Sequence, residues 1–411
     1  MNMNNVSETV ETKRERVIGI LAPDPYIKTA YGILAGEMAK RLKADGYNVI
    51  VLGNQHTSAP VGWEGITVTP YLKDAMLQDC LEYWIDEYHI EVVVCIFNFW
   101  ALTYLVPLSQ RKGFKYIAWT PVEGLLNKAS LSEEQHAMLD NAAAVISTCN
   151  FVKEQLKNAG HDSEVVYSAV SDKLKLLPFY ETRKEMNLPE KDFVVGFVGR
   201  NYTERKLIPY VMKCFADFLA KIPEDEKGHC ILYLHTNREY AARTYDLDRL
   251  SGYFGLKGRV MLPKRQLSID PVDDEQMNKI YNTMDVFLFP SMGEGFNVPL
   301  AEAMYLSIPC IVHDAHAHAE LIADTEMIKI PSKMSYWPLF SGMIEEMKLP
   351  DMDAMTEELY EFYKAYRKNK GIEMIIGARA AEKAAQWTWD NTYKSFKPIL
   401  ERVLGVQNGD L

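Results

Sequence analysis

The chain has 411 residues, 48% of them hydrophobic, which favours two globular domains with a sizeable core in each. A formal net charge of −11 argues against a protein that follows a nucleic-acid backbone, because such binding needs a dense positive face. The six cysteines are scattered, without a C-x-x-C pair or ligand-like spacing to histidine, so neither disulfides nor a zinc site is indicated, and a cytoplasmic setting is expected.

The amino-terminal part reads as a tail followed by an α/β domain over residues 16–178. Residues 1–15 are polar and lack the apolar core of a signal peptide, so we expect a disordered tail. Short apolar runs then alternate with helical patterns, at residues 17–22, 47–53, 91–97, 114–120, 143–148 and 163–169. The first helical stripe consists of Tyr31, Ala35, Met38 and Leu42. Continuously apolar strands predict a parallel sheet covered on both faces.

One uncharged segment, residues 92–110, approaches the ~20-residue length of a membrane-spanning helix. Its β-branched start, Asn98 and Pro107 favour instead a buried strand, a loop and a helix.

A second α/β series is expected over residues 179–383, after a charged connector. Its apolar runs are residues 193–199, 230–235, 259–262, 284–290, 308–314 and 327–330. Its first helix carries an apolar stripe of Leu207, Val211, Phe215 and Phe218. Residues 384–411 are expected to form a helix that packs back on the first domain. Two doubly wound domains would face a cleft at the carboxyl ends of their strands, where open α/β sheets bind ligands.

The segment 289–304, FPSMGEGFNVPLAEAM, predicts a strand end, a turn and a helix start. Gly293 and Gly295 permit a tight turn, and Asn297 can cap the helix that follows. The free N–H groups of that helix would suit an anion, most simply a phosphate.

Two glutamates accompany this helix start. Glu294 precedes it, whereas Glu302 lies one turn inside a helix that is otherwise apolar, where an acid needs a partner. The alternative is that both acids complement the helix dipole and stay solvated.

A second polar constellation is FVGRNYTERKL, in which Arg200 directly follows a strand and Lys206 begins the next helix. Both cations would lie at the carboxyl edge of the sheet, where they could meet a diphosphate. A solvated surface pair is the alternative.

Two other patterns suggest metals only superficially. The D-x-D strings at residues 246–248 and 351–353 lie in helix-like settings and are expected to be solvated. His313, His316 and His318 are expected to border the cleft, because no closed ligand geometry is evident. The sequence therefore predicts no metal site.

The two polar constellations resemble the retaining glycosyltransferases of family 4, which have the GT-B architecture of two Rossmann-like domains. The likeness lies in an E-x(7)-E signature, Glu294 to Glu302, and in a G-R…R-K signature made of Gly199, Arg200, Arg205 and Lys206. It is strong over residues 190–325 and weaker in the first domain.

The resemblance implies a role for each residue. Arg200 and Lys206 would hold the diphosphate of a nucleotide-sugar and neutralise the leaving group. Glu302 would bind the ribose hydroxyls, and Glu294 would contact the transferred sugar. Further donor contacts would come from Gly199, from Gly32 in the loop after the first strand, and from the backbone N–H groups of Phe296, Asn297 and Val298.

The chain departs from the family's pattern at three places. Tyr31 precedes Gly32 where members often have a glycine pair, and Asn297 stands where a glycine is usual. The loop at residues 119–124 has no histidine, so Glu123 could orient the acceptor or the sugar. On the same acceptor side, Phe99 or Trp100 could stack on a sugar ring, and core packing is the alternative for at least one of them.

The resemblance thus predicts a retaining, metal-independent transferase without a cofactor. It would move a hexose-type sugar from a nucleotide-diphosphate sugar, which carries UDP or GDP, to a hydroxyl group of a carbohydrate or lipid-linked acceptor. Peripheral contact with a membrane would be compatible with this function, and binding of nucleic acid is not expected. A glycosidase using Glu294 and Glu302 would not need Arg200 and Lys206. A nucleotide-sugar epimerase and a non-catalytic nucleotide-sugar binding protein remain alternatives.

Overall fold

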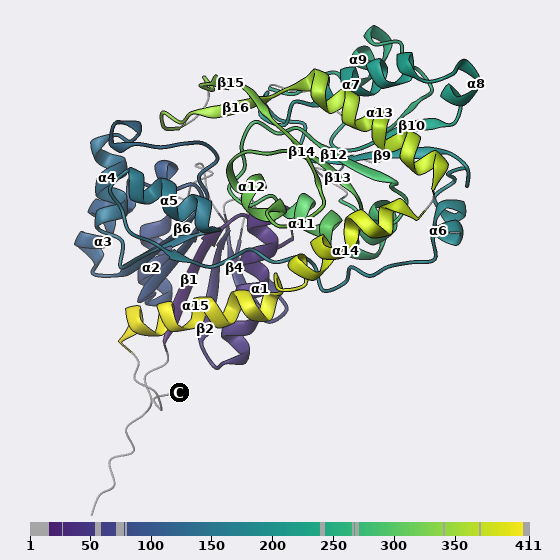
Figure 1. The fold of residues 1–411 in the computed structure, drawn as a ribbon. Helices are drawn as coiled ribbons and strands as arrows, with labels where there is room; N and C mark the ends of the chain where they lie inside the picture. The colour runs from purple at the N-terminus through teal and green to yellow at the C-terminus, as the bar shows by residue number, and fades with distance from the viewer. Residues whose placement is uncertain are drawn as a thin grey trace, which may run out of the picture.

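A computed structural model describes residues 16–26, 28–53, 59–70, 78, 80–238, 243–264, 267, 271–339, 342–369 and 371–405. The expected tail at residues 1–15 lies outside this part of the chain. Two parallel sheets, each flanked by helices, form two domains that face each other (Figure 1). The predicted fold class of two Rossmann-like domains is confirmed.

The first sheet has the strand order β3-β4-β2-β1-β5-β6-β7-β8, and only β3 and β4 pair antiparallel. Its strands are β1 (Val17–Ala22), β2 (Asn48–Gly53), β3 (Val61–Trp63), β4 (Ile66–Thr69), β5 (Val92–Ile96), β6 (Lys115–Thr120), β7 (Ala144–Ser147) and β8 (Glu164–Val165). The six predicted runs supply every strand except β3 and β4, whose apolar residues are interrupted by Gly62 and by threonines.

The helices around the first sheet are α1 (Ala30–Ala44), α2 (Leu81–Tyr88), α3 (Leu105–Lys112), α4 (Glu133–Asp140) and α5 (Asn150–Asn158), with short 3-10 turns η1 (Phe99–Ala101) and η2 (Lys128–Ser130). Helix α1 begins where the Thr29 side chain accepts the Gly32 N–H, and it buries Ala35, Met38 and Leu42. The uncharged segment of residues 92–110 divides into β5, η1 and the start of α3, as predicted. Among the described helices, none is both long and apolar enough to cross a bilayer.

The second sheet is parallel throughout, with the order β11-β10-β9-β12-β13-β14. Its strands are β9 (Phe193–Val198), β10 (Cys230–His235), β11 (Val260–Met261), β12 (Val286–Phe289), β13 (Cys310–His313) and β14 (Ile328–Ile330). A separate antiparallel hairpin, β15 (Ser332–Tyr336) with β16 (Met347–Pro350), was not predicted.

The helices of the second domain are α6 (Phe179–Glu185), α7 (Ile208–Lys221), α8 (Glu224–Lys227), α9 (Leu247–Tyr253), α10 (Asp274–Tyr281), α11 (Val298–Tyr305), α12 (His316–Ile322), α13 (Met352–Lys368) and α14 (Ile372–Ala384). Helices α7 and α13 pack together on one side of the sheet, and α11 and α14 on the other (Figure 1). The predicted stripe of α7 is buried, with Leu207 as the residue that caps the helix.

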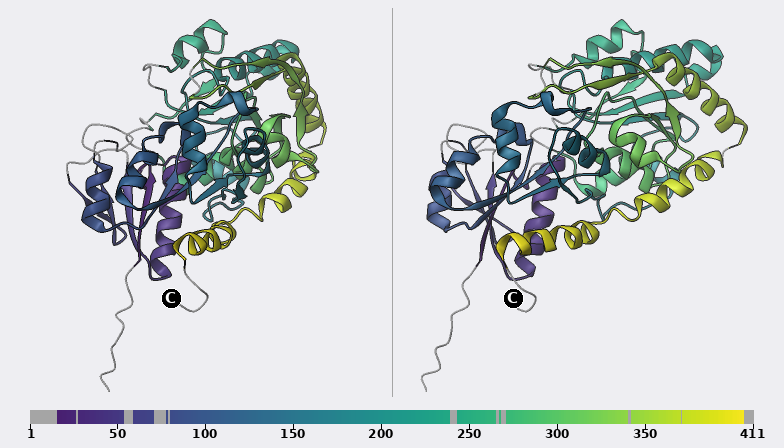
Figure 2. Two further views of the ribbon diagram at one scale, coloured as in Figure 1. Left: turned by 90° about the vertical axis from the view of Figure 1, so that its left-hand side faces the viewer. Right: turned by 60° about the vertical axis from the view of Figure 1, so that its left-hand side comes forward.

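The last helix, α15 (Trp389–Leu404), leaves the second domain and packs along the first (Figure 2). The Phe396 ring lies 5.1 Å from that of Trp119 on β6. Asp45, at the end of α1, accepts hydrogen bonds from Tyr393 at 2.7 Å and from Lys397 at 2.6 Å. These contacts tie α15, which continues from the second domain, to the first domain.

The domains also touch directly where their strands end. The Thr148 hydroxyl donates to the Gly295 carbonyl at 2.5 Å. Glu320 of α12 accepts the Phe151 N–H at the start of α5 at 2.7 Å. The β15–β16 hairpin reaches across as well, since Leu125 and Glu346 form an antiparallel bridge. The structure therefore shows the two domains in contact around the predicted cleft.

Candidate active site

The centre of the site is an ion-pair cluster between the loops that follow β9 and β12. Glu294 is buried after β12, and its Oε1 accepts from the Lys206 ammonium and from the Ser291 hydroxyl at 2.8 Å. Arg205 Nη1 lies 2.8 Å from the same oxygen. The sequence predicted Glu294 and Lys206 at this sheet edge but assigned no role to Arg205 or Ser291.

The cluster keeps Glu294 ionised. Burial by itself would raise the pKa of Glu294, but the adjacent charges of Arg205 and Lys206 outweigh it and hold the pKa well below its usual value. Lys206 also lies over the Phe289 ring, 5.0 Å from its centroid, so the ammonium is held from two sides.

Glu123 joins this cluster from the other domain. It follows β6, and its Oε1 lies 3.0 Å from Arg205 Nη2. Burial raises the pKa of Glu123 to about 7; the Arg205 charge opposes this, and the Glu345 and Glu294 carboxylates add to it. The side chain is 31% exposed, so Glu123 remains accessible at the junction between the domains.

The two glycines of the GEG sequence serve close packing. Neither glycine has a positive φ among the described residues. A Cβ on Gly293 would stand 2.1 Å from the Glu123 carbonyl oxygen, and one on Gly295 would stand 2.4 Å from the Pro121 Cβ. The glycines therefore let the loop after β6 approach the backbone on both sides of Glu294.

Asn297 caps α11 as predicted. Its side chain accepts the Leu300 N–H at 3.2 Å, and its backbone is left-handed, with φ 82°. Asparagine tolerates this conformation better than most residues and glycine better still, which explains why glycine is the common alternative here. The buried Nδ2 has no hydrogen-bond partner among the described residues. Val298 is the first residue of α11 and is half-buried, whereas the Phe296 ring is buried against Trp387, 5.5 Å between centroids.

Glu302 lies in α11 with a partner from α10. Its Oε2 accepts a hydrogen bond from the Tyr281 hydroxyl at 2.7 Å. Burial raises the pKa of Glu302 to about 7, because the single hydrogen bond from Tyr281 compensates only part of the lost hydration. Tyr281 thus supplies part of the hydrogen bonding that this acid needs.

Arg200 does not join the cluster. It is exposed and its guanidinium lies over the Tyr202 ring, 5.1 Å from the centroid. Gly199, which precedes it, lies beside Lys206, since a Cβ there would be 3.8 Å from the Lys206 Cδ. In the described part of the chain no hydrogen bond or ion pair joins Arg200 to Glu294.

The first domain presents the start of α1 to this cluster. Gly32 is buried in the first turn, and the Tyr31 hydroxyl donates to Asn98 Oδ1 at 3.0 Å. Burial chiefly raises the pKa of the Tyr31 phenol, and the negative charges of Glu123 and Glu294 add to this shift. Tyr31 is therefore near enough to these acids for their charges to affect it.

The two aromatic acceptor candidates differ. Phe99 is 1% exposed in the core of the first domain, so its predicted stacking role is wrong. Trp100 is half-buried, and a Cβ on Gly342 would stand 2.1 Å from its indole ring. The loop of the β15–β16 hairpin thus covers one face of Trp100.

The three histidines are buried, and the expected loop at the cleft border is wrong. His313 in β13 bonds to the Ser291 carbonyl at 2.9 Å and to the Ser332 hydroxyl at 2.8 Å. His316 and His318 lie in α12, and burial lowers the pKa of His318 to about 3. Both are neutral components of the packing behind Glu294.

Both D-x-D strings begin helices. Asp246 caps α9 by accepting the Arg249 N–H at 3.0 Å, and Asp351 caps α13 by accepting the Ala354 N–H at 3.1 Å. No group of three or more possible metal ligands occurs among the described residues.

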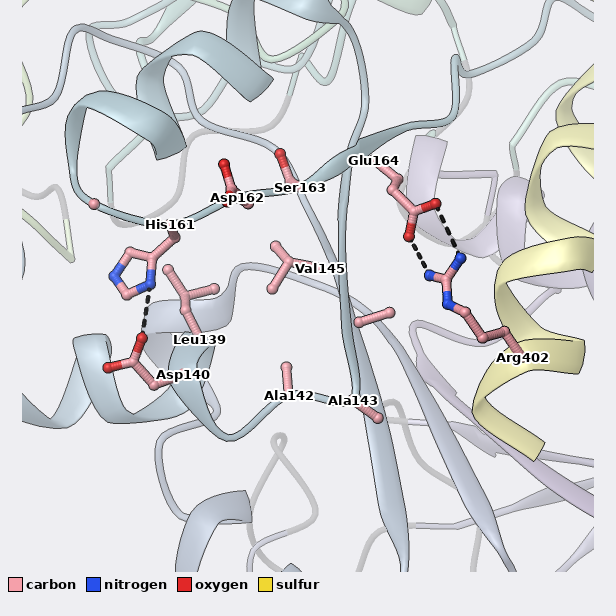
Figure 3. A pocket seen from close by; sticks show the side chains of 12 residues that line it. Leu139, Asp140, Ala142, Ala143, Val145, His161, Asp162, Ser163, Glu164 and Arg402 are labelled. Carbon is pink, nitrogen blue, oxygen red and sulfur yellow. Dashed lines mark hydrogen bonds and ion pairs between the residues drawn. The ribbon is translucent and has the colours of Figure 1, made fainter. Parts of the chain in front are cut away.

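A separate pocket lies elsewhere. It has a volume of about 400 Å³ and lies beside β7 and β8 (Figure 3). Its lining includes an ion pair of Arg402 with Glu164 and a contact of His161 with Asp140, whose atoms are 3.1 Å apart (Figure 3). None of the predicted site residues lines this pocket.

Sequence reasoning missed Arg205, Tyr31, Ser291 and Glu345 as site residues. Arg205 was in the matched signature, and Tyr31 was noted as a departure from it, so both carried a signal. Glu345 lies in the loop of the hairpin and accepts the Gly124 N–H at 2.9 Å, a contact that has no counterpart in the sequence pattern.

Comparisons with known proteins agree with this geometry. Residues 192–334 match the family model described as Glycosyl transferases group 1. A curated relative, O-antigen chain mannosyltransferase B of Escherichia coli, is 23% identical over 120 residues, which are 29% of this chain and 26% of the relative. The match therefore spans about a quarter of that relative's length.

Solved structures share the fold over nearly the whole chain. Sucrose-phosphate synthase from Thermosynechococcus elongatus has a TM-score of 0.74 at 16% identity, covering 95% of this chain and 100% of that one. WaaG, a glycosyltransferase involved in lipopolysaccharide biosynthesis, has a TM-score of 0.65 at 13% identity, with coverage of 95% and 100%. The catalytic domain of starch synthase IV from Arabidopsis thaliana, bound to ADP and acarbose, has a TM-score of 0.63 at 12% identity, with coverage of 95% and 99%.

The predicted resemblance is therefore confirmed: the chain shares the GT-B fold of these solved structures, and its residues 192–334 match the model of the glycosyl transferases group 1.

Proposed function

We propose that the chain is a retaining glycosyltransferase that moves a hexose-type sugar from a nucleotide-diphosphate sugar to a hydroxyl acceptor. The observation that carries this proposal is the buried cluster of Glu294, Lys206 and Arg205 at the strand ends, beside the start of α11. A carboxylate for sugar hydroxyls, a lysine for a departing diphosphate and the capped start of α11 lie together there.

Lys206 and the start of α11 would stabilise the negative charge that develops on the leaving diphosphate. Arg200 would reach the same diphosphate by changing its side-chain rotamer, because it is exposed and held only over Tyr202. The unpartnered Asn297 Nδ2 is a further donor for an oxygen of the nucleotide-sugar. These groups provide the positive charge for sugar transfer without a bound metal ion.

Retention would follow from attack on the face that the diphosphate leaves. The bond from the anomeric carbon to the phosphate oxygen breaks, the bond to the acceptor oxygen forms, and the acceptor proton passes to the departing phosphate. Glu294 would hold the sugar hydroxyls during this step, and Glu302 the ribose of the nucleotide.

The acceptor would approach from the first domain, which contributes Glu123 to the cluster and Tyr31, hydrogen-bonded to Asn98, at the start of α1. Polar side chains of this kind suit the hydroxyls of a carbohydrate, either free or lipid-linked with peripheral membrane contact. A curated relative is named as a mannosyltransferase, so nucleotide-activated mannose belongs among the first donors to test.

Calorimetry with nucleoside diphosphates, followed by hydrolysis and transfer assays on a panel of nucleotide-sugars, tests the function. We expect binding of one diphosphate class, turnover in the presence of EDTA and a product that keeps the donor's anomeric configuration. Binding without any turnover would favour the non-catalytic alternative, and turnover without an acceptor to a changed sugar would favour the epimerase.

A further inference from the structure

Arg205 is held rigidly between the two loops of the cluster. Its carbonyl accepts the Met292 N–H at 2.9 Å, and its Nη1 donates to the Gly293 carbonyl at 2.7 Å. The side chain is 22% exposed and contacts a carboxylate on either side, Glu294 at 2.8 Å and Glu123 at 3.0 Å. One guanidinium therefore connects acids that belong to different domains.

The contacts on Glu294 are one-sided. Arg205, Lys206 and Ser291 all bind Oε1. Among the described residues no hydrogen bond or ion pair falls on Oε2. Anchoring one oxygen fixes the plane of the carboxylate and leaves the other oxygen to accept a hydrogen bond from a substrate.

The Glu123 contact depends on how the domains meet. Glu123 lies in the loop after β6, whose main chain is fixed by the contact of Glu345 with the Gly124 N–H at 2.9 Å and by close packing on Gly293. Separation of the domains would remove Glu123 from Arg205 and free the guanidinium to rotate about its remaining contacts.

We propose that Arg205 is a positioning residue, which orients Glu294 for the sugar and makes that orientation depend on the arrival of Glu123 from the first domain. This inference rests on the proposed function of the site. It assigns no contact between Arg205 and the diphosphate, because the guanidinium is occupied by two carboxylates and a carbonyl.

The variants are Arg205→Lys, Arg205→Met and Glu123→Gln. A lysine keeps the charge but lacks the planar fork that reaches two acids at once. Arg402→Lys and Glu164→Gln are matched controls, because this pair also joins an arginine to a glutamate and lies in the separate pocket of Figure 3. We expect the controls to match the parent chain in every assay.

In transfer assays we expect Arg205→Lys to lower kcat about 100-fold, the scale of a misplaced catalytic group, while nucleoside diphosphate affinity stays within about threefold. Glu123→Gln should lower kcat less. An unchanged kcat in Arg205→Lys would overturn the proposal. So would a loss of nucleotide affinity as large as that of Lys206→Ala, since Arg205 would then bind the diphosphate directly.

The pH dependence of kcat distinguishes a positioning role of Arg205 and Glu123 from a general loss of folded protein. The charged groups that face Glu123 are Arg205, Lys206, Glu294 and Glu345, and together with burial they place the pKa of Glu123 at about 7. Above that pH the Glu123 carboxylate can hold Arg205, so kcat should rise through pH 7 in the parent chain. This rise should be absent in Glu123→Gln, and a Glu123→Gln profile identical to that of the parent would contradict the proposal.

Amide hydrogen exchange provides a readout that does not need turnover. In Arg205→Met the amides of residues 122–124 should exchange about tenfold faster, because the loop loses its partner across the domains. Unchanged exchange there would overturn the inference even if the parent chain is an active transferase. Absence of nucleotide binding in the parent chain would instead refute the proposed function.

Discussion

The Lys206 ammonium binds one carboxylate oxygen of Glu294, although 88 positions separate the two residues in the chain. The contact joins the ends of neighbouring strands, because β9 and β12 pair directly in the second sheet. Two signatures that are distant in sequence thus form one cluster of paired charges.

Glu294→Gln should lower sugar transfer by about 100-fold or more, because a neutral amide cannot hold the sugar hydroxyls or the two cations equally well. Nucleoside diphosphate affinity should stay the same or become tighter, since Lys206 loses a competing anion. Transfer assays and calorimetry measure the two effects, with the exposed Glu357→Gln as control. Full transfer activity in Glu294→Gln would refute the assigned role.

Lys206→Ala should weaken binding and turnover together. A hydrogen bond to a charged group contributes about 1.5–3 kcal/mol, so the nucleoside diphosphate affinity should fall roughly 10- to 150-fold. Lys213→Ala is the matched control, because Lys213 is exposed and pairs with Asp217 in the same helix, α7. Equal affinities for the two variants in calorimetry would remove Lys206 from the donor site.

Asn297 should respond differently to alanine and to glycine. Asn297→Ala loses the cap of α11 and leaves alanine, which tolerates the left-handed region less well than asparagine, at a left-handed backbone position, at a combined cost of about 2 kcal/mol in the free energy of unfolding. Asn297→Gly keeps the backbone conformation and should cost only a few tenths of a kcal/mol. Denaturant unfolding compares them; similar losses for both would show that the backbone angle does not matter.

Gly293→Ala should impair the contact between the domains more than the fold of either. The new Cβ would overlap the Glu123 carbonyl oxygen, a main-chain atom that cannot rotate away. We expect kcat to fall at least tenfold, with nucleoside diphosphate binding largely retained. Gly228→Ala, where a Cβ meets no atom within 4 Å, is the control, and equal kcat values for both variants would contradict the expectation.

Glu302 should make stability depend on pH. Its folded-state pKa of about 7 lies above the usual 4.5, so the folded chain favours the protonated acid. The stability that protonation contributes is complete below pH 4.5 and is lost as the pH rises to 7. The Tm of Glu302→Gln should therefore rise relative to that of the parent chain as the pH is raised from 5 to 8. The same variant should bind nucleotide more weakly. A Tm difference that does not change with pH would show that Glu302 is not titrating in this range.

Much of the fold could be predicted from the sequence, because strands and helices have different spacings of apolar residues. The apolar runs became β1, β2 and β5 to β14, and the apolar stripes of α1 and α7 are buried. Strands β3 (VGW) and β4 (ITVT) escaped because Gly62 and the threonines interrupt their apolar residues, and the hairpin of β15 and β16 escaped because three of the five residues of β15 are exposed.

The candidate site was readable where the chemistry depends on residues close in sequence. Asn297 caps its helix through a contact only three positions long, and Glu294 and Lys206 follow strands whose ends define the sheet edge. The role of Arg205 was not readable, because its partner Glu123 comes from another domain.

The sequence by itself determined the two α/β domains, the sheet edge that carries the polar residues and the identity of the paired glutamates, since these depend on local periodicity and spacing. Only the tertiary structure decided that Phe99 is core, that Arg200 stands apart from the cluster, and that Gly293 and Gly295 exist for the approach of the loop after β6. The physical reason is that these outcomes depend on contacts between segments far apart in the chain, which local patterns do not encode.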